Sequence, residues 1–389
     1  MNRLLFFLLL SLSANLLIAQ SAGKIHRRAI LVDTHNDIPS TAIDGGFRFD
    51  QPLKPRTHSD LQRMAEGGVD AQFFSIWCDG NKPDPFHWAL REIDTVVAWA
   101  SRNPGKMMMA TSAKDIRTAV RQKKLAALLG VEGGHMIEND PDKLVTLYNR
   151  GVRYMTITWN NSTPWATSAL DETTKGDSLP HKGLTPFGRS IIQKMNELGM
   201  LVDLSHVGEQ TFWDVMNVTT KPVLVSHSCV YTLCPHRRNL KDEQIKAVAK
   251  NGGVIHLNFY SGFLDPGFEA RSDAFTNRHK TELDSLLKLN PEPYFAEVFL
   301  FNKYPGEVKD LRPPLSLLLD HLDYIVKLAG VDHVGLGSDF DGVNSLPQGL
   351  NGVEDFPKIT EELLKRGYSK KDIRKILGGN MLRLLKANE

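Results

Sequence analysis

Eight short apolar runs, each of strand length, dominate this sequence and limit what it can fold into. The segments between them, such as residues 84–101, 186–198 and 314–328, place apolar residues three and four positions apart, as amphipathic helices do. Strands that alternate with helices are typical of a parallel sheet. Because eight is the strand count of a (β/α)8 barrel, the pattern predicts an α/β fold of the TIM-barrel type. The runs comprise residues 29–37, 70–77, 125–133, 152–159, 201–207, 222–228, 252–260 and 333–341.

The chain of 389 residues has room for more than one domain, yet α/β barrels often run past about 250 residues as one unit. We therefore predict a single barrel domain over residues 20–389. Ahead of it, Arg3 precedes an apolar stretch that starts at Leu4 and leads to small residues around Ala19, which is the layout of a secretory signal peptide. A permanent membrane anchor is the alternative, but this Ser-interrupted stretch is shorter than the ~20 residues that a span needs. The sequence thus predicts a signal peptide over residues 1–19 and an exported protein, periplasmic or secreted.

Charge and cysteine content exclude several classes of function. The formal net charge is only +2, with 47 basic and 45 acidic residues, so there is no basic stripe and no nucleic-acid partner is expected. The three cysteines, Cys78, Cys229 and Cys234, are scattered and form no Cys-x-x-Cys pair. We therefore expect neither a disulfide framework nor a metal bound by cysteine.

Two ionisable residues close the first apolar run. His35 and Asp37, in VDTHND, are two positions apart on one strand and so point to the same side. Glu132 follows the third run in VEGGH, where a buried carboxylate must be paired or bound to a cation. Nitrogen and oxygen ligands of this kind suit zinc. Taken alone, His35 and Asp37 are more often a structural hydrogen-bonded pair than a pair of metal ligands, and Glu132 is equally compatible with a salt bridge and with a metal ligand.

Two histidines repeat one pattern on consecutive predicted strands, His206 in DLSHV and His227 in VSHS. A single histidine of this sort is usually a satisfied core residue, but two beside the earlier triplet favour a metal site. Asp339, in GLGSDFDG, ends the eighth run between glycines that let a ligand approach the backbone. Asp341 is the competing choice, although its position two residues further on suits a cap of the following turn.

The C-terminal strand ends of such a barrel converge on one mouth, where active sites of this fold lie. With more ligands than one zinc ion needs, the economical arrangement is a pair of zinc ions in a barrel of the metal-dependent hydrolase kind. His35 and Asp37 would hold one ion, His206 and His227 the other, and Glu132 would bridge them. Asp339 would then handle protons during hydrolysis of an amide.

The remaining histidines receive weaker interpretations. His135 is a candidate partner of the metal ligands, and His256 a candidate for the pocket wall. The others lie in polar or helical contexts and are expected at the surface: His26, His58, His87, His181, His279, His321 and His333. Two insertions, residues 161–184 and 261–312, leave from the mouth side of their strands, where loops form a substrate pocket.

The ordered motifs HND, VEGGH, TPWA, DLSHV, VSHS, RRN, NFY and GSDFDG resemble those of the membrane (renal) dipeptidase family of zinc metallopeptidases. The resemblance runs from about residue 29 to residue 385. It implies a binuclear zinc barrel that cleaves dipeptides, tolerates a D-residue at the C-terminal position and, in some members, opens β-lactams.

Carried over by position, the resemblance implies the same metal ligands and the same proton-handling residue as above. It also implies that Arg238, in HRRN, binds the carboxylate of the substrate and that Tyr260 is the tyrosine of the pocket. The chain departs from the vertebrate members in three places. Trp159 stands where they have a substrate-binding histidine, Asn161 stands in place of a cysteine, and the C-terminal anchor signal is missing. Indole donates one hydrogen bond but accepts no proton, so Trp159 changes what this position can do.

We therefore predict an exported dipeptidase with two zinc ions and dipeptide substrates, with Glu132 and Asp339 in catalysis and Arg238, Tyr260 and Trp159 at the substrate. No stable membrane anchor is expected, and a homodimer is compatible with the sequence. Another barrel amidohydrolase, such as a lactonase relative, is the first alternative, although those usually begin with H-x-H. An inactive barrel that binds peptides is the second.

Overall fold

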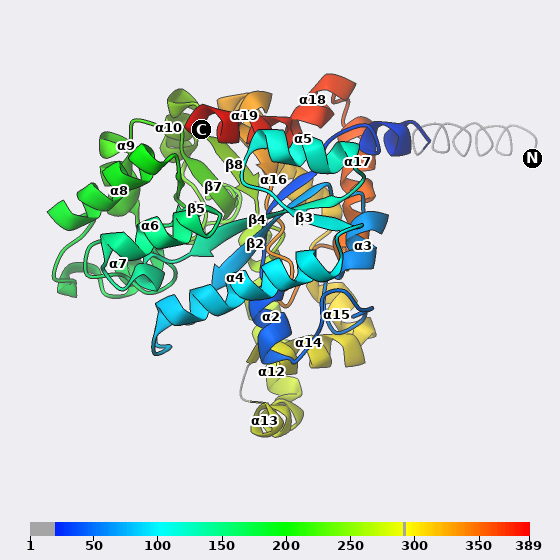
Figure 1. The fold of residues 1–389 in the computed structure, drawn as a ribbon. Helices are drawn as coiled ribbons and strands as arrows, with labels where there is room; N and C mark the ends of the chain where they lie inside the picture. Colours follow the sequence, from blue (N-terminus) through cyan, green and yellow to red (C-terminus); the bar gives the residue numbers. More distant parts are fainter. Residues whose placement is uncertain (1–19, 291–292) are drawn as a thin grey trace, which may run out of the picture.

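The computed structural model describes residues 20–290 and 293–389 and has a closed ring of parallel strands surrounded by helices (Figure 1). Each of the eight predicted runs contains one strand of the ring, which confirms the predicted (β/α)8 fold. The predicted signal peptide, residues 1–19, lies outside the described residues. The ring strands are β1 Val32–Asn36, β2 Ala71–Trp77, β4 Leu125–Glu132, β5 Val152–Thr156, β6 Leu201–Asp203, β7 Leu224–Ser228, β8 Val254–Leu257 and β9 Val334–Leu336.

Two pairings close the ring. β2 pairs with β4 along its whole length, ending with Trp77 opposite Glu132, and β1 pairs with β9 at Asp33 and Leu336. Around the rest of the ring, each strand pairs in parallel with its neighbour. Because all the strands run the same way, their C-terminal ends open at one mouth.

One further strand, β3 Met107–Met109, was not predicted. It pairs with the first residues of β4, from Leu125 to Ala127, whereas β5 pairs with the later ones, from Leu129 to Glu132. β3 therefore lengthens the sheet at the N-terminal end of the barrel and takes no part in the mouth.

The helices that follow the ring strands cover the outside of the barrel. The three helices predicted in detail are present: α8 has the predicted bounds, and α4 and α16 are shifted by one residue. The bounds of α8 follow from its caps, since the Thr185 side chain accepts a hydrogen bond from the Gly188 N–H and Gly199 ends the helix with a φ of 77°. The barrel helices are α2 Ile38–Asp44, α3 Leu61–Glu66, α4 Pro85–Arg102, α5 Ala113–Arg121, α6 Pro141–Asn149, α7 Ala169–Thr174, α8 Pro186–Leu198, α9 Glu209–Val218, α10 Asp242–Asn251, α16 Leu315–Ala329, α17 Phe356–Lys365, α18 Lys370–Arg374 and α19 Asn380–Asn388.

Shorter helical turns join these elements, namely η1 Gly134–Ile137, η2 Gly176–Ser178, η3 Val331–His333, η4 Val353–Asp355 and η5 Lys375–Gly379. Across the described residues, every helix is either too short or too polar to pass through a bilayer.

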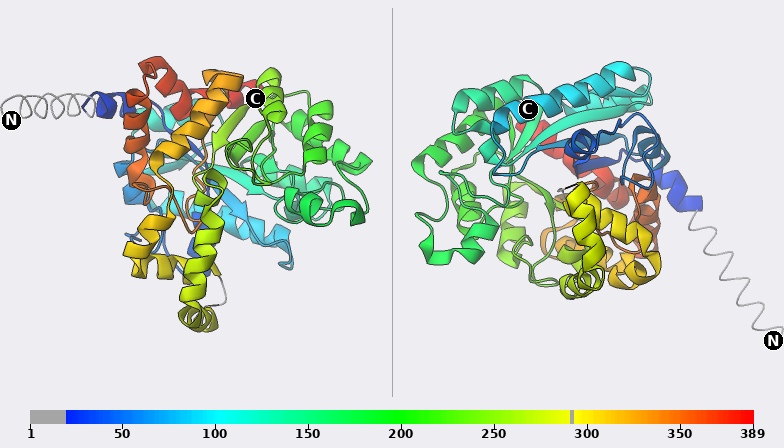
Figure 2. Two further views of the ribbon diagram at one scale, coloured as in Figure 1. Left: turned by 180° about the vertical axis from the view of Figure 1, so that it is seen from behind. Right: turned by 90° about the horizontal axis from the view of Figure 1, so that it is seen from below.

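The insertion after β8 forms a subassembly of helices with its own apolar core. Figures 1 and 2 show α12 and α13 projecting away from the barrel, with α14 beside α2 and α15. Its helices are α11 Ser261–Leu264, α12 Phe268–Arg278, α13 Lys280–Leu289, α14 Pro293–Lys303 and α15 Pro305–Leu311. The buried core comprises Phe268, Phe275, Leu300, Phe301, Val308 and Leu311.

The C-terminal helix α19 closes the N-terminal end of the barrel. Met381 and Leu384 share a buried cluster with Val32, Ala126 and other residues from the starts of the ring strands. The chain kinks before this helix at Gly378, where a Cβ atom would lie 2.4 Å from the Ile30 carbonyl oxygen. A side chain at that position would therefore separate the helix from β1.

Candidate metal centre

The structure brings the six ionisable residues predicted from the strand ends together at the mouth of the barrel. His35 lies in β1 and Asp37 directly after it, Glu132 ends β4, and His227 lies in β7. His206 and Asp339 follow β6 and β9. Their ligand atoms form three overlapping groups in which all atoms lie within 4.8 Å of one another: His35, Asp37 and Glu132; Glu132, His206 and His227; His35, His227 and Asp339.

The first group centres on the Nε2 atom of His35. This atom lies 3.4 Å from Asp37 Oδ2 and 3.4 Å from Glu132 Oε2. The other ring nitrogen, Nδ1, is 3.0 Å from the Tyr154 hydroxyl, which fixes the orientation of the imidazole. His35 is fully buried, and among the described residues its Nε2 has no hydrogen-bond partner. A buried nitrogen that faces two carboxylates and has no hydrogen bond of its own suits a metal ligand.

The second group centres on the other oxygen of Glu132. Its Oε1 lies 2.9 Å from His206 Nε2 and 3.4 Å from His227 Nε2. The Nδ1 atoms point away from this centre, that of His206 toward Asn160 Oδ1 at 3.2 Å and that of His227 toward Ser226 Oγ at 2.8 Å. Each carboxylate oxygen of Glu132 thus faces a different group, which is the geometry that a bridging ligand needs.

The electrostatics of the cluster favour bound cations. Burial lowers the pKa of His206 to about 3 and that of His227 well below its ordinary value, so both are the neutral imidazoles that zinc binds. Burial also opposes protonation of His35. Even so, Tyr154, Asp37 and Glu132 together raise its pKa well above the ordinary value, because they favour a positive charge at its position. Two imidazoles with a carboxylate form a donor set that fits zinc.

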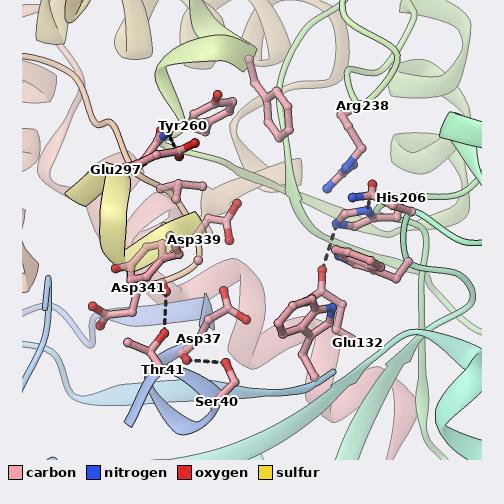
Figure 3. Close-up of a pocket in the computed structure, with 18 of the residues that line it drawn as sticks. Asp37, Ser40, Thr41, Glu132, His206, Arg238, Tyr260, Glu297, Asp339 and Asp341 are labelled. Atoms are coloured by element: carbon pink, nitrogen blue, oxygen red, sulfur yellow. Dashed lines mark hydrogen bonds and ion pairs between the residues drawn. The ribbon is translucent and has the colours of Figure 1, made fainter. Parts of the chain in front are cut away.

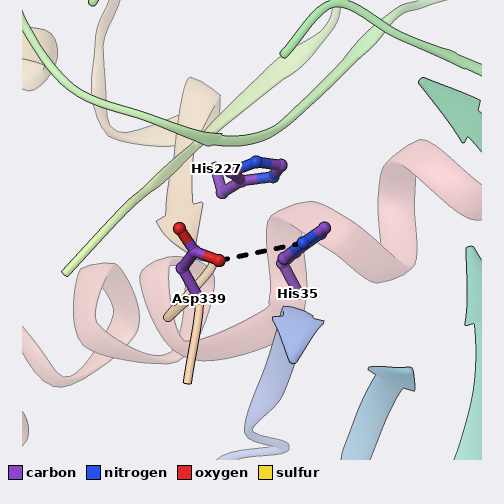
Figure 4. A group of neighbouring side chains, drawn as sticks. All are labelled: His35, His227 and Asp339. Carbon is purple, nitrogen blue, oxygen red and sulfur yellow. Dashed lines mark ion pairs between the residues drawn. The ribbon is translucent and has the colours of Figure 1, made fainter. Parts of the chain in front are cut away.

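Asp339 stands at the edge of this cluster. Its Oδ1 is 3.9 Å from His35 Nε2 (Figure 4). Its Oδ2 accepts a hydrogen bond from Asn258 Nδ2 at 2.7 Å. Burial raises the pKa of Asp339 to about 7 against the opposing charge of His35. Asp339 has a φ of 62° and His206 a φ of 65°, a left-handed backbone that non-glycine residues rarely adopt and that clusters at functional sites.

Two buried carboxylates hold the ligand-bearing strand ends together. Asp33 accepts hydrogen bonds from the N–H and the hydroxyl of Ser338 at 2.8 and 2.6 Å, which joins the strand of His35 to the loop of Asp339. Asp203 accepts the corresponding pair from Ser226 and a third bond from the Thr156 hydroxyl. Neither acid was predicted to act here, although each lies two or three residues before a ligand histidine.

A cavity of about 420 Å³ lies above the cluster, and Figure 3 shows Arg238 on the His206 side with Asp37, Asp339 and Asp341 across from it. Arg238 is buried and donates to Ser228 Oγ at 3.3 Å and to the His227 carbonyl at 3.2 Å. Burial lowers its pKa to about 10, so the side chain stays cationic at neutral pH.

The other predicted substrate residues also line the cavity. The Tyr260 hydroxyl donates to Glu269 Oε1 at 2.9 Å. The Trp159 ring packs edge-on against Trp77, with ring centroids 5.0 Å apart, and lies 6.3 Å from the His206 ring. Sequence reasoning missed Trp77, which ends a predicted strand as the ligands do. It also missed two further lining residues that carry no strand signal, Tyr294 and Glu297.

Several weaker predictions about side chains were wrong. His256 is buried against the Val225 carbonyl and does not line the cavity, and His135 contacts the Cys78 carbonyl rather than a metal ligand. Asp341 does not cap the turn after it, because its carboxylate accepts hydrogen bonds from the backbone of His58 and the hydroxyl of Ser59.

Two histidines expected at the surface are buried instead. His26 contacts the Thr360 hydroxyl and the Gly67 carbonyl, and His321 contacts the Leu264 carbonyl. Their partners come from distant segments, which the local sequence does not reveal. All three cysteines, each of them in the described part of the chain, are free and buried.

Comparison with known proteins places this geometry in a family. The model of the membrane dipeptidase family, peptidase family M19, matches residues 19–389. The structure of the probable dipeptidase PvdM from Pseudomonas aeruginosa aligns with a TM-score of 0.79 at 24% sequence identity, over 95% of this chain and 98% of that chain. A metallopeptidase from Rhodobacter sphaeroides, liganded with a phosphinate mimic of the dipeptide L-Ala-D-Ala, aligns with a TM-score of 0.74 at 24% identity, over 93% of this chain and 100% of that chain. At these identities, the two structures establish a shared fold.

Proposed function

The chain belongs to the membrane dipeptidase family and is a metallo-dipeptidase, and on this premise we propose that it uses two zinc ions to hydrolyse the peptide bond of dipeptides. The position of Glu132 carries this proposal, because one of its oxygens faces His35 and the other faces His206. A single carboxylate shared in this way suits two ions better than one. The first ion would be held by His35, Asp37 and Glu132, and the second by Glu132, His206 and His227.

When bound, two ions of this kind supply Lewis acidity toward the peptide carbonyl and activate the attacking water. The proton chemistry falls to Asp339, whose buried carboxylate lies beside the metal-binding groups, 3.9 Å from His35 Nε2. It would take a proton from the attacking water and deliver it to the leaving amine. Its hydrogen bond from Asn258 fixes the carboxylate for both transfers.

Arg238 binds the free carboxylate of the substrate in this proposal. A guanidinium holds a carboxylate with two parallel hydrogen bonds, and burial strengthens such a charge-assisted contact. Because the residue sits beside the ligands His206 and His227, it would set how far a substrate extends beyond the reacting bond. That restriction is what makes a dipeptidase rather than an endopeptidase.

The remaining side chains of the cavity would shape it. The packing of Trp159 against Trp77 forms an aromatic wall, and Tyr260 contributes a second aromatic face. We propose that this cavity accepts a D-residue at the C-terminal position. The complex of the Rhodobacter sphaeroides metallopeptidase with a mimic of L-Ala-D-Ala supports this extension.

We also propose that the protein is exported, with residues 1–19 as its signal peptide, and that it acts in the periplasm or outside the cell. The arrangement of Arg3 and the apolar residues that follow supports this proposal. A homodimer is compatible with it.

Two measurements test the function. Metal analysis of the purified protein should give about two zinc ions per chain, and a screen of L-L, L-D and glycine-containing dipeptides should reveal turnover that a chelator abolishes and zinc restores. A protein that binds peptides without zinc and without turnover would be a binding barrel. Cleavage of lactones in preference to dipeptides would instead place its activity with other barrel amidohydrolases.

A further inference from the structure

The two ends of the cavity differ in charge. Arg238 supplies a cation at one end, and across from it lie the carboxylates of Asp37, Asp339 and Asp341 (Figure 3). A dipeptide is itself dipolar, with a carboxylate at one terminus and an amino group at the other. If its carboxylate lies on Arg238, its amino group points toward the acidic end.

Tyr294, the second residue of α14, lines that acidic end. Its hydroxyl oxygen is shielded from solvent and has no hydrogen-bond partner within residues 20–290 and 293–389. Burial raises the pKa of this phenol well above its ordinary value, so the group stays neutral and keeps its proton. Three nearby carboxylates add to the effect, those of Asp341, Asp37 and Asp339.

The helix that carries Tyr294 is fixed over the mouth. Asn344, in the segment after β9, donates a hydrogen bond to Glu297 of α14 at 2.6 Å, and Asn302 of α14 donates to the Pro55 carbonyl at 3.2 Å. Leu300 of the same helix is fully buried in the core of the insertion. These contacts with the barrel and with the core of the insertion keep the helix in place and therefore hold the phenol at the cavity.

Tyr260, the pocket tyrosine implied by the family resemblance, differs from Tyr294 in its hydrogen bonding. The Tyr260 hydroxyl already donates to Glu269, whereas the Tyr294 hydroxyl neither donates to nor accepts from any of the residues that the structure describes. The oxygen of a phenol in this position can accept a hydrogen bond from an amino group. The unsatisfied group in the cavity is thus matched to the free amino terminus of a dipeptide.

We propose that Tyr294 is a specificity-determining residue whose hydroxyl binds the free α-amino group of the substrate. This inference rests on the proposed dipeptidase function and adds to it the recognition of the amino end. Tyr294 at the amino end and Arg238 at the carboxylate end together select a substrate of two residues with both termini free.

The test compares Tyr294→Phe with Tyr304→Phe. The control residue belongs to the same insertion, and its hydroxyl donates to Glu282 Oε2 at 2.7 Å outside the cavity. With L-Ala-D-Ala, Tyr294→Phe should raise KM by tenfold or more and leave kcat within threefold. Tyr304→Phe should leave both parameters within twofold of wild type. Zinc content should be unchanged in both variants.

A second measurement tests the contribution of the substrate amino group alone. N-propionyl-D-alanine has the shape of L-Ala-D-Ala without its amino group, and its inhibition constant should be the same for wild type and Tyr294→Phe. An unchanged KM for the dipeptide, an equal loss of affinity for the des-amino compound, or a loss of zinc would each overturn the inference. If wild type cleaves no dipeptide at all, the proposed function fails and the inference with it. Turnover with an insensitive Tyr294→Phe overturns the inference alone.

Discussion

The carboxylate of Asp203 accepts two hydrogen bonds from Ser226, one from the backbone N–H at 2.8 Å and one from the hydroxyl at 2.6 Å. This contact joins the end of β6, which leads to His206, to β7, which carries His227. The same hydroxyl of Ser226 lies 2.8 Å from His227 Nδ1. One small side chain therefore fixes both the spacing of two ligand strands and the orientation of a ligand ring.

Ser226→Ala should weaken metal binding. Partners that orient a metal-binding histidine typically contribute about 10–100-fold to metal affinity or activity, and we expect a loss of that size. A competition titration with a chromophoric zinc chelator measures it. Ser272→Ala, at a buried serine of α12 outside the cavity, is the control and should bind zinc as wild type does. Equal affinities in all three proteins would show that Ser226 does not orient the ligand.

His206→Ala should reduce the zinc content from about two ions per chain to about one. The reason is that His206 belongs only to the group that contains Glu132 and His227. Elemental analysis of protein freed of loosely bound metal measures the stoichiometry. His87→Ala, at an exposed histidine, should keep the wild-type content. Two ions in the His206 variant would contradict the assignment of ligands.

Asp339→Asn should lower kcat by about 10²–10⁴-fold and keep both ions, since loss of a general acid or base has an effect of that size. The asparagine can still accept the hydrogen bond from Asn258, so the local structure should persist. Steady-state kinetics together with metal analysis check both statements. Loss of one ion would make Asp339 a ligand, and wild-type turnover would remove it from the proton chemistry.

Arg238→Lys should raise KM for dipeptides by about 30-fold or more, because losing a buried charge-assisted contact that leaves an anion unpaired has a free-energy effect of roughly 2–5 kcal/mol. Lysine keeps the charge but not the paired geometry of the guanidinium. Wild-type enzyme should in addition cleave an amidated dipeptide poorly. Equal cleavage of the free and amidated forms would exclude Arg238 as the carboxylate site.

Trp159→Phe tests whether the indole N–H stabilises negative charge in the transition state or whether the ring only shapes the cavity. The edge-on packing against Trp77 supports the shaping role, which phenylalanine preserves in part. We therefore expect kcat within about threefold of wild type and a changed preference among dipeptide side chains. A fall in kcat equivalent to about 2.7–4 kcal/mol, with zinc content unchanged, would instead identify an oxyanion donor.

The barrel could be read from the sequence because each ring strand lies in a short, mostly apolar run, and five of the eight runs carry an ionisable site residue near their ends. β3 could not be read in this way, since three methionines carry neither alternation nor a closing polar residue. The helix α8 was predicted to the residue because Thr185 and Gly199 mark its ends chemically.

The ligand residues were found for the same reason as the strands, because they lie where the runs end. Tyr294 was not found, since it lies in an insertion whose position over the mouth depends on contacts with distant residues such as Asn344. Asp33 and Asp203 were not identified, because the sequence near a ligand histidine looks the same whether a neighbouring carboxylate binds the metal or hydrogen-bonds to the next strand. Long-range contacts of this kind decide roles that local patterns leave open.

Residues from both ends of the described chain complete the floor of the barrel. Val32 of β1 and Met381 of α19 share one buried cluster, and Gly378 lies against the backbone of Ile30. Fraying of α19 would expose the apolar starts of several strands at once, so this helix should come apart only when the whole barrel does. Its amide hydrogens should therefore be among the slowest to exchange with solvent.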